Sequence, residues 1–192
     1  MKRALDKIFY PKTIAAIGAS NKAGTIGYML MKNLTSGSFK GKVYPVNPKY
    51  NQIHGYLAYH KVRDIQDDID LAIIATPAKT VPRIVRQCGK AGIQGIIILS
   101  SVKEAGAQLE ADIREYIKEY DLRVIGPDSL GIIQPALGLN ATFASQTALP
   151  GKIAFISQSG ALCNAILDWS REGNFGFSHF VSIGSMTDTA YH

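Results

Sequence analysis

Short runs of apolar residues alternate along this chain with segments in which apolar residues recur at helical spacing. The apolar runs are continuous rather than interrupted at every second position, which is typical of strands buried on both faces. In the first part of the chain these runs are residues 13–17, 43–46, 71–75, 95–99 and 123–125. Three segments between them carry apolar residues on one helix face: residues 25–34, 80–91 and 107–120.

Strands that are buried on both faces need a layer of helices on each side, and strands joined through helices pair in parallel. The pattern therefore predicts an α/β fold. We expect a doubly wound parallel sheet, in a Rossmann-like domain formed by residues 1–128.

The pattern changes after this domain. Residues 129–150 show little periodicity and include Pro135 and Gly138, which predicts a linker. A strand at 153–156, a helix at 161–171 and a strand at 180–183 then follow, with Leu167 and Trp169 expected in the core. One β-α-β unit cannot bury both faces of its strands, so we expect residues 151–192 to begin a second, flavodoxin-like α/β domain that is incomplete in this chain.

Composition narrows the classes of protein that fit. The 192 residues are 46% hydrophobic and carry a net charge of +6, and the basic excess is dispersed over residues 1–128. Nucleic acid is one interpretation of this excess, but it is not interleaved with aromatic residues, so a small anionic ligand fits as well. We expect no nucleic-acid partner. The sequence has neither a signal peptide nor an apolar run of membrane-spanning length, so we expect a cytoplasmic protein with no membrane partner. Cys88 and Cys163 are expected to be buried thiols, and no Cys or His spacing indicates a metal site.

The first candidate site is the turn between the first strand and the first helix. Backbone N–H groups at such a helix start can hold a phosphate, and glycine allows its close approach. The spacing of Gly18, Gly24 and Gly27 differs from the usual dinucleotide fingerprint and from the Walker A motif. An ordinary tight turn is the alternative. The candidate binding residues here are Gly18, Ser20, Asn21, Lys22, Gly24 and Thr25.

The second candidate pair is Asn47 and Lys49, at the end of the second strand. NAD-binding folds place an acidic residue here to accept a hydrogen bond from the ribose. An amide and a cation instead suit a ligand with an extra phosphate, such as CoA or NADP. The alternative is that Asn47 and Pro48 only end the strand.

Hydroxyl groups follow the third and fourth strands. Thr76-Pro77 and Ser100-Ser101 stand where open α/β sheets bind ligands, beyond the carboxyl ends of the strands. They could contact a pyrophosphate or an amide of a ligand, or they could simply cap helices.

A second strand-to-helix turn carries two more hydroxyls. Its residues are Ser157, Gln158, Ser159 and Gly160. The first glycine of a nucleophile elbow is absent, and no histidine and acid are placed to activate Ser159. We therefore expect a phosphate-binding turn rather than a hydrolase site, and we assign no catalytic residue in this chain.

These motifs together resemble the N-terminal part of the NDP-forming acyl-CoA synthetases, the family of the ADP-forming acetate–CoA ligases. The succinyl-CoA synthetase alpha subunit is a more distant relative. The resemblance covers nearly the whole chain and is carried by residues 10–15, 17–20, 43–48, 125–127, 138–143 and 153–161.

The resemblance implies that the first domain holds coenzyme A (CoA) or acyl-CoA. It places Ser20, Asn21, Lys22 and Lys49 around the phosphates, and Ser100-Ser101 in a further contact loop. The full enzymes convert an acid, CoA and ATP to acyl-CoA, ADP and phosphate through a phosphohistidine. In them a turn like residues 157–160 holds phosphate beside that histidine.

The resemblance also implies partners. Neither the reactive histidine nor the ATP-grasp domain of the family occurs in these 192 residues. We therefore expect the chain to need further synthetase domains or an ATP-grasp subunit, and not to turn over alone; a homo-oligomer stays open, as does whether the chain is itself an enzyme.

The sequence departs from the family at two places, and the second leaves an alternative open. Asp128 replaces an asparagine, and a carboxylate there would weaken anion binding unless it is hydrogen-bonded or protonated. Residues 184–190 differ from the usual family motif and resemble relatives fused to a protein lysine acetyltransferase. The alternative function is therefore the CoA-binding regulatory part of such a fused acetyltransferase.

Overall fold

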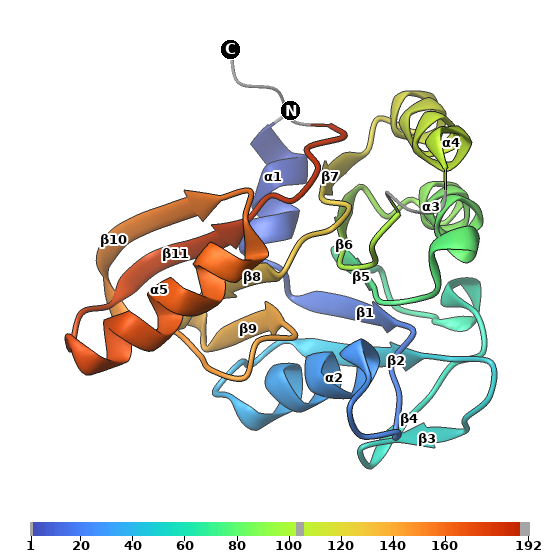
Figure 1. Cartoon of the computed structure of the whole chain (residues 1–192). Helices are drawn as coiled ribbons and strands as arrows, with labels where there is room; N and C mark the ends of the chain where they lie inside the picture. The colour runs from blue at the N-terminus through green and yellow to red at the C-terminus, as the bar shows by residue number, and fades with distance from the viewer. Residues whose placement is uncertain (1, 103–105, 189–192) are drawn as a thin grey trace.

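A five-stranded parallel sheet forms the centre of the molecule, as the sequence predicts. The computed structural model describes residues 2–102 and 106–188 (Figure 1). The strands follow the order β2-β1-β5-β6-β7. Their bounds are β1 Thr13–Ile17, β2 Lys42–Val46, β5 Leu71–Ile74, β6 Gly95–Ile98 and β7 Arg123–Ile125. All the pairings within this sheet are parallel.

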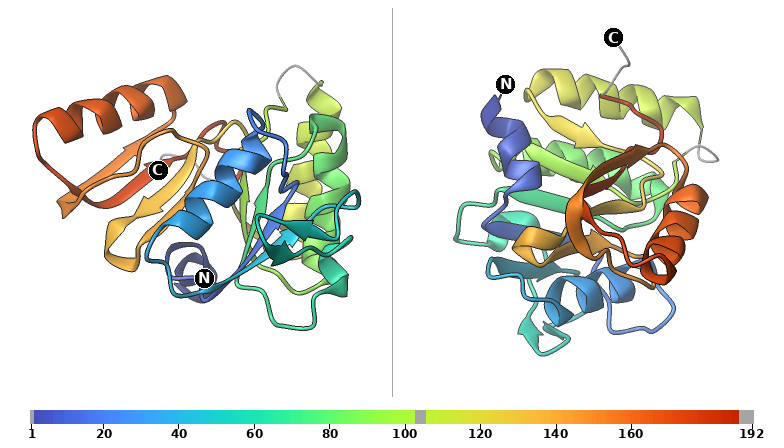
Figure 2. Two further views of the ribbon diagram at one scale, coloured as in Figure 1. Left: turned by 90° about the horizontal axis from the view of Figure 1, so that it is seen from below. Right: turned by 90° about the vertical axis from the view of Figure 1, so that its left-hand side faces the viewer.

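Helices cover both faces of this sheet, as a doubly wound fold requires (Figure 2). They are α1 Lys2–Phe9, α2 Ile26–Ser36, α3 Val81–Lys90 and α4 Ala107–Glu119. Successive residues of β1 point to opposite faces. Ala15 and Ile17 pack in the core under α3 and α4, whereas Ile14 and Ala16 pack in the core under α1 and α2. The continuous apolar runs in the sequence therefore have the physical cause that we inferred from them.

A second, mixed sheet of four strands lies beside the first. Its order is β10-β11-β8-β9, and only the β10–β11 pair is parallel. The strands are β8 Gly131–Gln134, β9 Leu139–Thr142, β10 Pro150–Ser157 and β11 Phe177–Ser182. Helix α5 (Gly160–Glu172) covers one face, above a core that includes Cys163, Phe177 and Phe180. The other face contributes Ile132 and Val181 to the core that it shares with α2.

The expectation of an irregular linker at residues 129–150 is wrong in its local structure. These residues contain β8 and β9, joined by a short 3-10 helix (η4, Pro135–Leu137) and by Gly138, which has a φ of 65°. Each strand has only four residues and is buried throughout, so it shows no alternation. In β9 the buried Asn140 Oδ1 accepts a hydrogen bond from the Thr142 hydroxyl, whereas the buried Gln134 Oε1 at the end of β8 has no hydrogen-bond partner among the described residues. The division of the chain into domains stays a prediction.

The sequence patterns also missed three short elements. Helix α1 packs Ile8 into the core, and strands β3 (Gln52–Ile53) and β4 (Tyr56–Leu57) form a small hairpin. The remaining short elements are 3-10 helices η1 (Val62–Asp64) and η2 (Ala78–Thr80). Among the described residues, no helix is both long and apolar enough to cross a membrane.

The outer part of the second sheet leaves large apolar side chains in solvent. Strand β10 lies at the edge, and Ile153 and Ile156 on it are 49% and 63% exposed. On α5, Leu162 and Trp169 are 48% and 60% exposed, so the expectation of a buried Trp169 is wrong while that of a buried Leu167 is confirmed. The reason is that Trp169 lies on a different stripe of α5 from Cys163 and Leu167, which face the sheet.

Both cysteines are buried, as the sequence indicates. Burial raises the pKa of the Cys88 thiol to about 12. Burial also raises the pKa of the Cys163 thiol, against the opposing effect of hydrogen bonds from Ser182 and Ser157. Both thiols therefore stay protonated at neutral pH, which is the unreactive form of cysteine.

The two aromatic environments in the second sheet predict very different stability effects. Phe180 is fully buried, with its ring 4.8 Å from that of Phe155, whereas Trp169 is mostly exposed. We expect Phe180→Ala to lower the free energy of unfolding by about 3–5 kcal/mol. Trp169→Ala should lower it by less than about 1 kcal/mol. Urea unfolding followed by circular dichroism measures both, and equal losses would contradict this description of the core.

Candidate functional site

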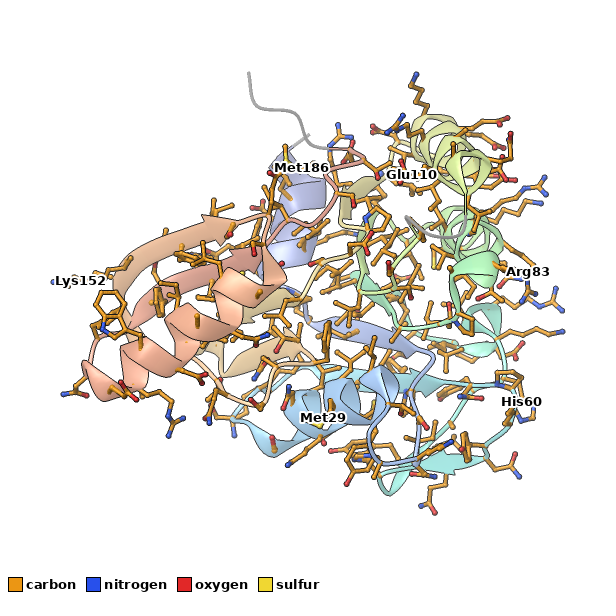
Figure 3. All side chains as sticks on the ribbon, viewed as in Figure 1. Met29, His60, Arg83, Glu110, Lys152 and Met186 are labelled. Atoms are coloured by element: carbon orange, nitrogen blue, oxygen red, sulfur yellow. The ribbon has the colours of Figure 1, made fainter. Side chains whose placement is uncertain are left out.

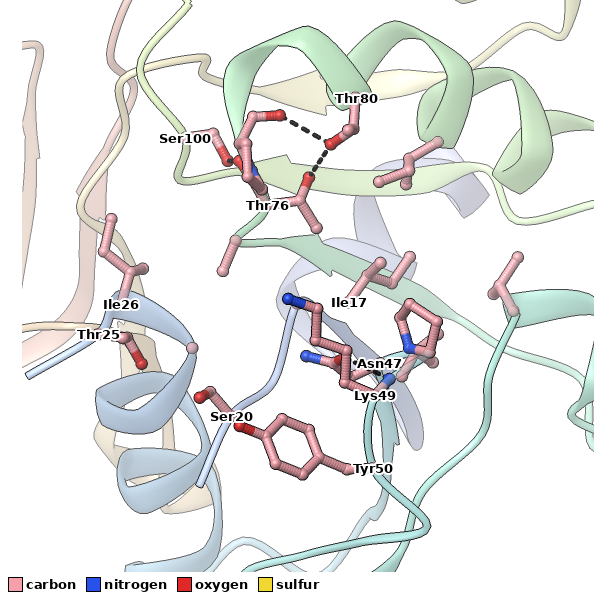
Figure 4. Close-up of a pocket in the computed structure, with 18 of the residues that line it drawn as sticks. Ile17, Ser20, Thr25, Ile26, Asn47, Lys49, Tyr50, Thr76, Thr80 and Ser100 are labelled. Atoms are coloured by element: carbon pink, nitrogen blue, oxygen red, sulfur yellow. Dashed lines mark hydrogen bonds between the residues drawn. The ribbon is translucent and has the colours of Figure 1, made fainter. Parts of the chain in front are cut away.

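A pocket of about 890 Å³ opens beyond the carboxyl ends of β1, β2, β5 and β6 (Figure 4). The chain order in the sheet reverses at β1, because β2 lies on one side of it and β5 on the other. Open α/β sheets bind their ligands at such a reversal. The pocket therefore stands where the topology alone would place a site.

Ten of the twelve residues predicted to bind the cofactor line this pocket. They come from four separate loops and are Gly18, Ser20, Lys22, Thr25, Asn47, Lys49, Thr76, Pro77, Ser100 and Ser101. Asn21 and Gly24 belong to the same turn but do not line the pocket. Residues 157–160 do not line it either.

Close backbone packing fixes the loop between β1 and α2 (residues 18–25, the β1–α2 loop). Gly18 has a φ of 89°, and a Cβ atom there would lie 2.4 Å from the Ala75 carbonyl oxygen. A Cβ atom on Gly27 would lie 1.9 Å from the Gly18 carbonyl oxygen. Glycine is required at both positions for this approach. The loop thus lies directly against the end of β5.

Hydrogen bonds within the β1–α2 loop decide which of its polar groups remain available. The Thr25 hydroxyl donates to the Lys22 carbonyl and accepts from the Tyr28 N–H, so it serves as the N-cap of α2. The Ser20 hydroxyl accepts from the Lys22 N–H at 2.9 Å and keeps its own proton for a ligand. Ile26 and Gly27, at the start of α2, line the pocket, and the first N–H groups of a helix lack partners within it. The loop therefore presents donors to an anion.

Asn47 and Lys49 have different roles, although both line the pocket. The Asn47 Nδ2 donates to the Ala19 carbonyl at 2.8 Å, and its Oδ1 accepts from the Lys49 N–H at 2.9 Å. Its amide therefore ties the β1–α2 loop to the end of β2. The Lys49 side chain extends into the pocket toward the end of β5 (Figure 4).

Most hydroxyl groups in the segments after β5 and β6 form hydrogen bonds within or between these two segments. Ser100 is nearly buried, and its hydroxyl donates to the Thr76 carbonyl at 2.6 Å. The Thr80 hydroxyl donates to the Pro77 carbonyl and lies 3.0 Å from the Thr76 hydroxyl. Ser101 is exposed. These contacts give the pocket a fixed wall opposite the β1–α2 loop.

The charge of the pocket is one-sided. The pocket is lined by Lys22, Lys49, Lys61 and Arg83. No Asp or Glu is among the described residues that line it. Arg83 and His60 lie on the same side of the molecule, at the outer rim (Figure 3). A concave surface with cations and no carboxylate favours an anionic ligand.

Sequence patterns missed Tyr50, His60, Lys61 and Arg83 as lining residues. Tyr50, His60 and Lys61 stand in the irregular segment around the β3–β4 hairpin. Arg83 lies on α3, three residues after Thr80 and therefore close to one helix turn beyond it. Only the helix position of Arg83 could have been found from spacing.

The turn at residues 157–160 forms a separate, self-contained structure at the start of α5. The Ser159 hydroxyl accepts from the Leu162 N–H and caps the helix, and the Ser157 hydroxyl accepts from the Ser159 N–H. The Gln158 amide lies 2.8 Å from the Met186 sulfur. The structure thus places this turn apart from the pocket residues.

Asp128 is hydrogen-bonded in the structure. Its Oδ2 accepts from the Ser185 hydroxyl at 3.1 Å, and the Ser185 N–H donates to the Pro127 carbonyl. The segment after β11 therefore runs beside residues 126–128. The two departures seen in the sequence, at Asp128 and at residues 184–190, contact each other.

Two families match the chain. Residues 12–135 match a family described as a CoA binding domain, and residues 150–192 match a succinyl-CoA ligase like flavodoxin domain.

Among proteins of known function, the chain is 48% identical to an ADP-forming acetate–CoA ligase of Methanocaldococcus jannaschii. That match covers 96% of this chain but 26% of the relative. The alpha subunit of an ADP-forming acetate–CoA ligase I of Pyrococcus furiosus is 40% identical over 96% of this chain and 42% of its own length. The chain therefore spans less than half of these relatives.

A solved structure shows the same fold. It is a dinucleotide-forming acetyl-coenzyme A synthetase 1 of Ca. Korarchaeum cryptofilum, in complex with phosphate and ADP. It superimposes with a TM-score of 0.92 at 39% identity, over 98% of this chain and 41% of that one.

A comparison of Gly18 and Gly24 distinguishes the steric effect of a side chain from the effect of a positive φ. Both Gly18 and Gly24 have a positive φ, but a Cβ atom on Gly24 would meet nothing within 4 Å. We expect Gly24→Ala to cost about 1 kcal/mol of stability through its φ alone. Gly18→Ala should cost clearly more, since its Cβ would collide with β5. Thermal unfolding of both variants tests this, and similar losses would rule out the close approach.

Proposed function

Because the chain belongs to the CoA-binding domain family, we propose that its pocket binds CoA and that the chain is the CoA-binding module of an ADP-forming acyl-CoA synthetase. The observation that carries this proposal is the pocket itself. It lies at the reversal of strand order, is lined by four cations without a carboxylate among the described residues, and contains the start of α2.

We assign the phosphates of CoA to the β1–α2 loop. The Ser20 hydroxyl, the Lys22 ammonium and the N–H groups at the start of α2 would hold the diphosphate there. Lys49 extends into the same space and would neutralise a phosphate. Thr25, Asn47 and Ser100 line the pocket, but their polar groups are bonded within the protein and act by fixing its walls.

The thiol-bearing arm of CoA would extend toward the ends of β5 and β6. Thr76, Pro77 and Ser101 line that side of the pocket. Backbone and hydroxyl groups there could bond the amides of the arm. Gly18 lies between the two parts, where any larger residue would collide with Ala75.

In the full-length protein we propose that this module supplies CoA for the conversion of an acid, CoA and ATP to acyl-CoA, ADP and phosphate. The turn at residues 157–160 would hold phosphate at the start of α5, as the match to a succinyl-CoA ligase like domain supports. The Ser159 hydroxyl is oriented by the turn and keeps its proton for such a group, whereas the Ser157 hydroxyl also bonds the Cys163 thiol.

The outer side of the second sheet is a candidate surface for packing against a further synthetase domain or subunit. Strand β10 is the edge strand of the sheet that the described residues form, and Ile153, Ile156, Leu162 and Trp169 are exposed on it and on α5. Exposed apolar patches of this kind mark interaction sites. We propose that the remaining synthetase domains, or an ATP-grasp subunit, pack in this region.

Calorimetric titration tests the ligand directly. We expect the 192-residue chain to bind CoA and to bind NADP much more weakly, because the spacing of Gly18, Gly24 and Gly27 departs from the dinucleotide-binding fingerprint. Binding of NADP without binding of CoA would overturn the proposed function.

Lys22 provides a test of the phosphate assignment. We expect Lys22→Ala to weaken CoA binding by about fivefold to tenfold, because one charge-assisted contact is lost. Binding of pantetheine, which lacks the phosphates, should not change. Lys40→Ala is the matched control, since Lys40 is exposed and does not line the pocket. Equal losses for CoA and pantetheine would contradict the phosphate role of Lys22.

A further inference from the structure

The β3–β4 hairpin (residues 52–57) lies beside the β1–α2 loop (Figure 1) and is hydrogen-bonded to it, but it does not line the pocket. Its tip consists of His54 and Gly55, with φ values of 50° and 86°. Two successive residues with positive φ make a tight two-residue turn. The hairpin is therefore a compact element that lies against the loop and outside the lining of the pocket.

Asn21 joins the two elements through both ends of its amide. The Asn21 Nδ2 donates to the Gln52 carbonyl at 2.9 Å, and the His54 N–H donates to the Asn21 Oδ1 at 3.0 Å. Asn21 stands between Ser20 and Lys22, both of which line the pocket. Along this stretch the flanking residues line the pocket while the central residue bonds the hairpin.

The hairpin is itself held in place from two directions. The His54 ring packs on the Tyr28 ring of α2, with centroids 4.7 Å apart, and Ile53 is fully buried in the core. After β4, the Tyr59 N–H donates to the Pro45 carbonyl, and the Asn47 N–H donates to the Tyr59 carbonyl. The hairpin thus connects the start of α2 to the end of β2, the two sides of the cationic part of the pocket.

We propose that Asn21 is a positioning residue and that the β3–β4 hairpin holds the β1–α2 loop in its anion-binding conformation. The loop contains Gly18 and Gly24, so without outside contacts it would lose much conformational freedom on binding a ligand. The two Asn21 bonds remove part of that freedom in advance, which raises affinity without any contact to the ligand. This inference rests on the proposed function, because it takes CoA as the anion.

Coupling of this kind works in both directions. If the hairpin favours the binding conformation of the loop, a bound ligand must stabilise the hairpin by the same free energy. CoA should therefore slow hydrogen exchange in the hairpin, including at the His54 amide, which donates to Asn21. A purely local structural bond would show no such response to ligand.

The first measurement compares Asn21→Ala with a matched control by calorimetry with CoA. We expect Asn21→Ala to weaken CoA binding by about tenfold, because the substitution removes two hydrogen bonds of modest net strength. The control is Asn33→Ala. Asn33 also makes two hydrogen bonds to backbone groups, in its case the carbonyls of Thr142 and Ala144, and like Asn21 it does not line the pocket. Asn33→Ala should lower the melting temperature and leave CoA affinity unchanged.

The second measurement needs no variant. Hydrogen exchange of the unaltered chain, with and without CoA, should show slower exchange in peptides that cover residues 52–57. In Asn21→Ala this protection should be lost at concentrations of CoA that saturate the variant.

Two results would overturn the inference: unchanged CoA affinity in Asn21→Ala, or unchanged exchange of the hairpin when the unaltered chain is saturated. Absence of CoA binding by the unaltered chain is a different result. It would remove the proposed function itself, and the inference with it.

Discussion

The contact between the start of the β1–α2 loop and the end of β5 constrains everything around the pocket. Gly18 lies so close to the Ala75 carbonyl that no side chain fits between them, and Gly27 lies even closer to the Gly18 carbonyl. These contacts bring the helix start over the carboxyl ends of the strands. The N–H groups of α2, the Ser20 hydroxyl and the Lys22 side chain can meet in one pocket only because the backbone approaches this closely.

The polar residues of the pocket fall into two groups according to whether their hydrogen-bond donors are already bonded within the protein. Asn47, Thr25 and Ser100 donate hydrogen bonds to backbone carbonyls, and these bonds fix the walls of the pocket. Lys49 and Ser20 keep free donors. A residue that lines the pocket therefore does not necessarily bond the bound molecule. The same reasoning applies to Asp128, whose carboxylate has a hydrogen-bond donor in Ser185.

The sequence predicted the parallel sheet and most of the pocket for a clear physical reason. Strands β1, β5 and β6 are short apolar runs that end at Gly or at hydroxyl residues, and parallel strands bring those ends together. Strands β8 and β9 escaped notice because four buried residues carry no periodic signal. The direction of Asn21 could not be predicted, since it depends on a hairpin about thirty residues further along the chain. The exposure of Trp169 likewise depends on which side of α5 the sheet leaves open.

The exposed stripe on α5 has a spectroscopic consequence. Trp169 is the only tryptophan in the chain, and it is one of the exposed apolar side chains of α5 and of the edge strand β10. Indole emission shifts to shorter wavelength when water is removed from the ring. The protein thus carries its own fluorescent reporter at the surface where a neighbouring domain would pack, while the pocket around Lys49 contains no tryptophan to interfere with the signal.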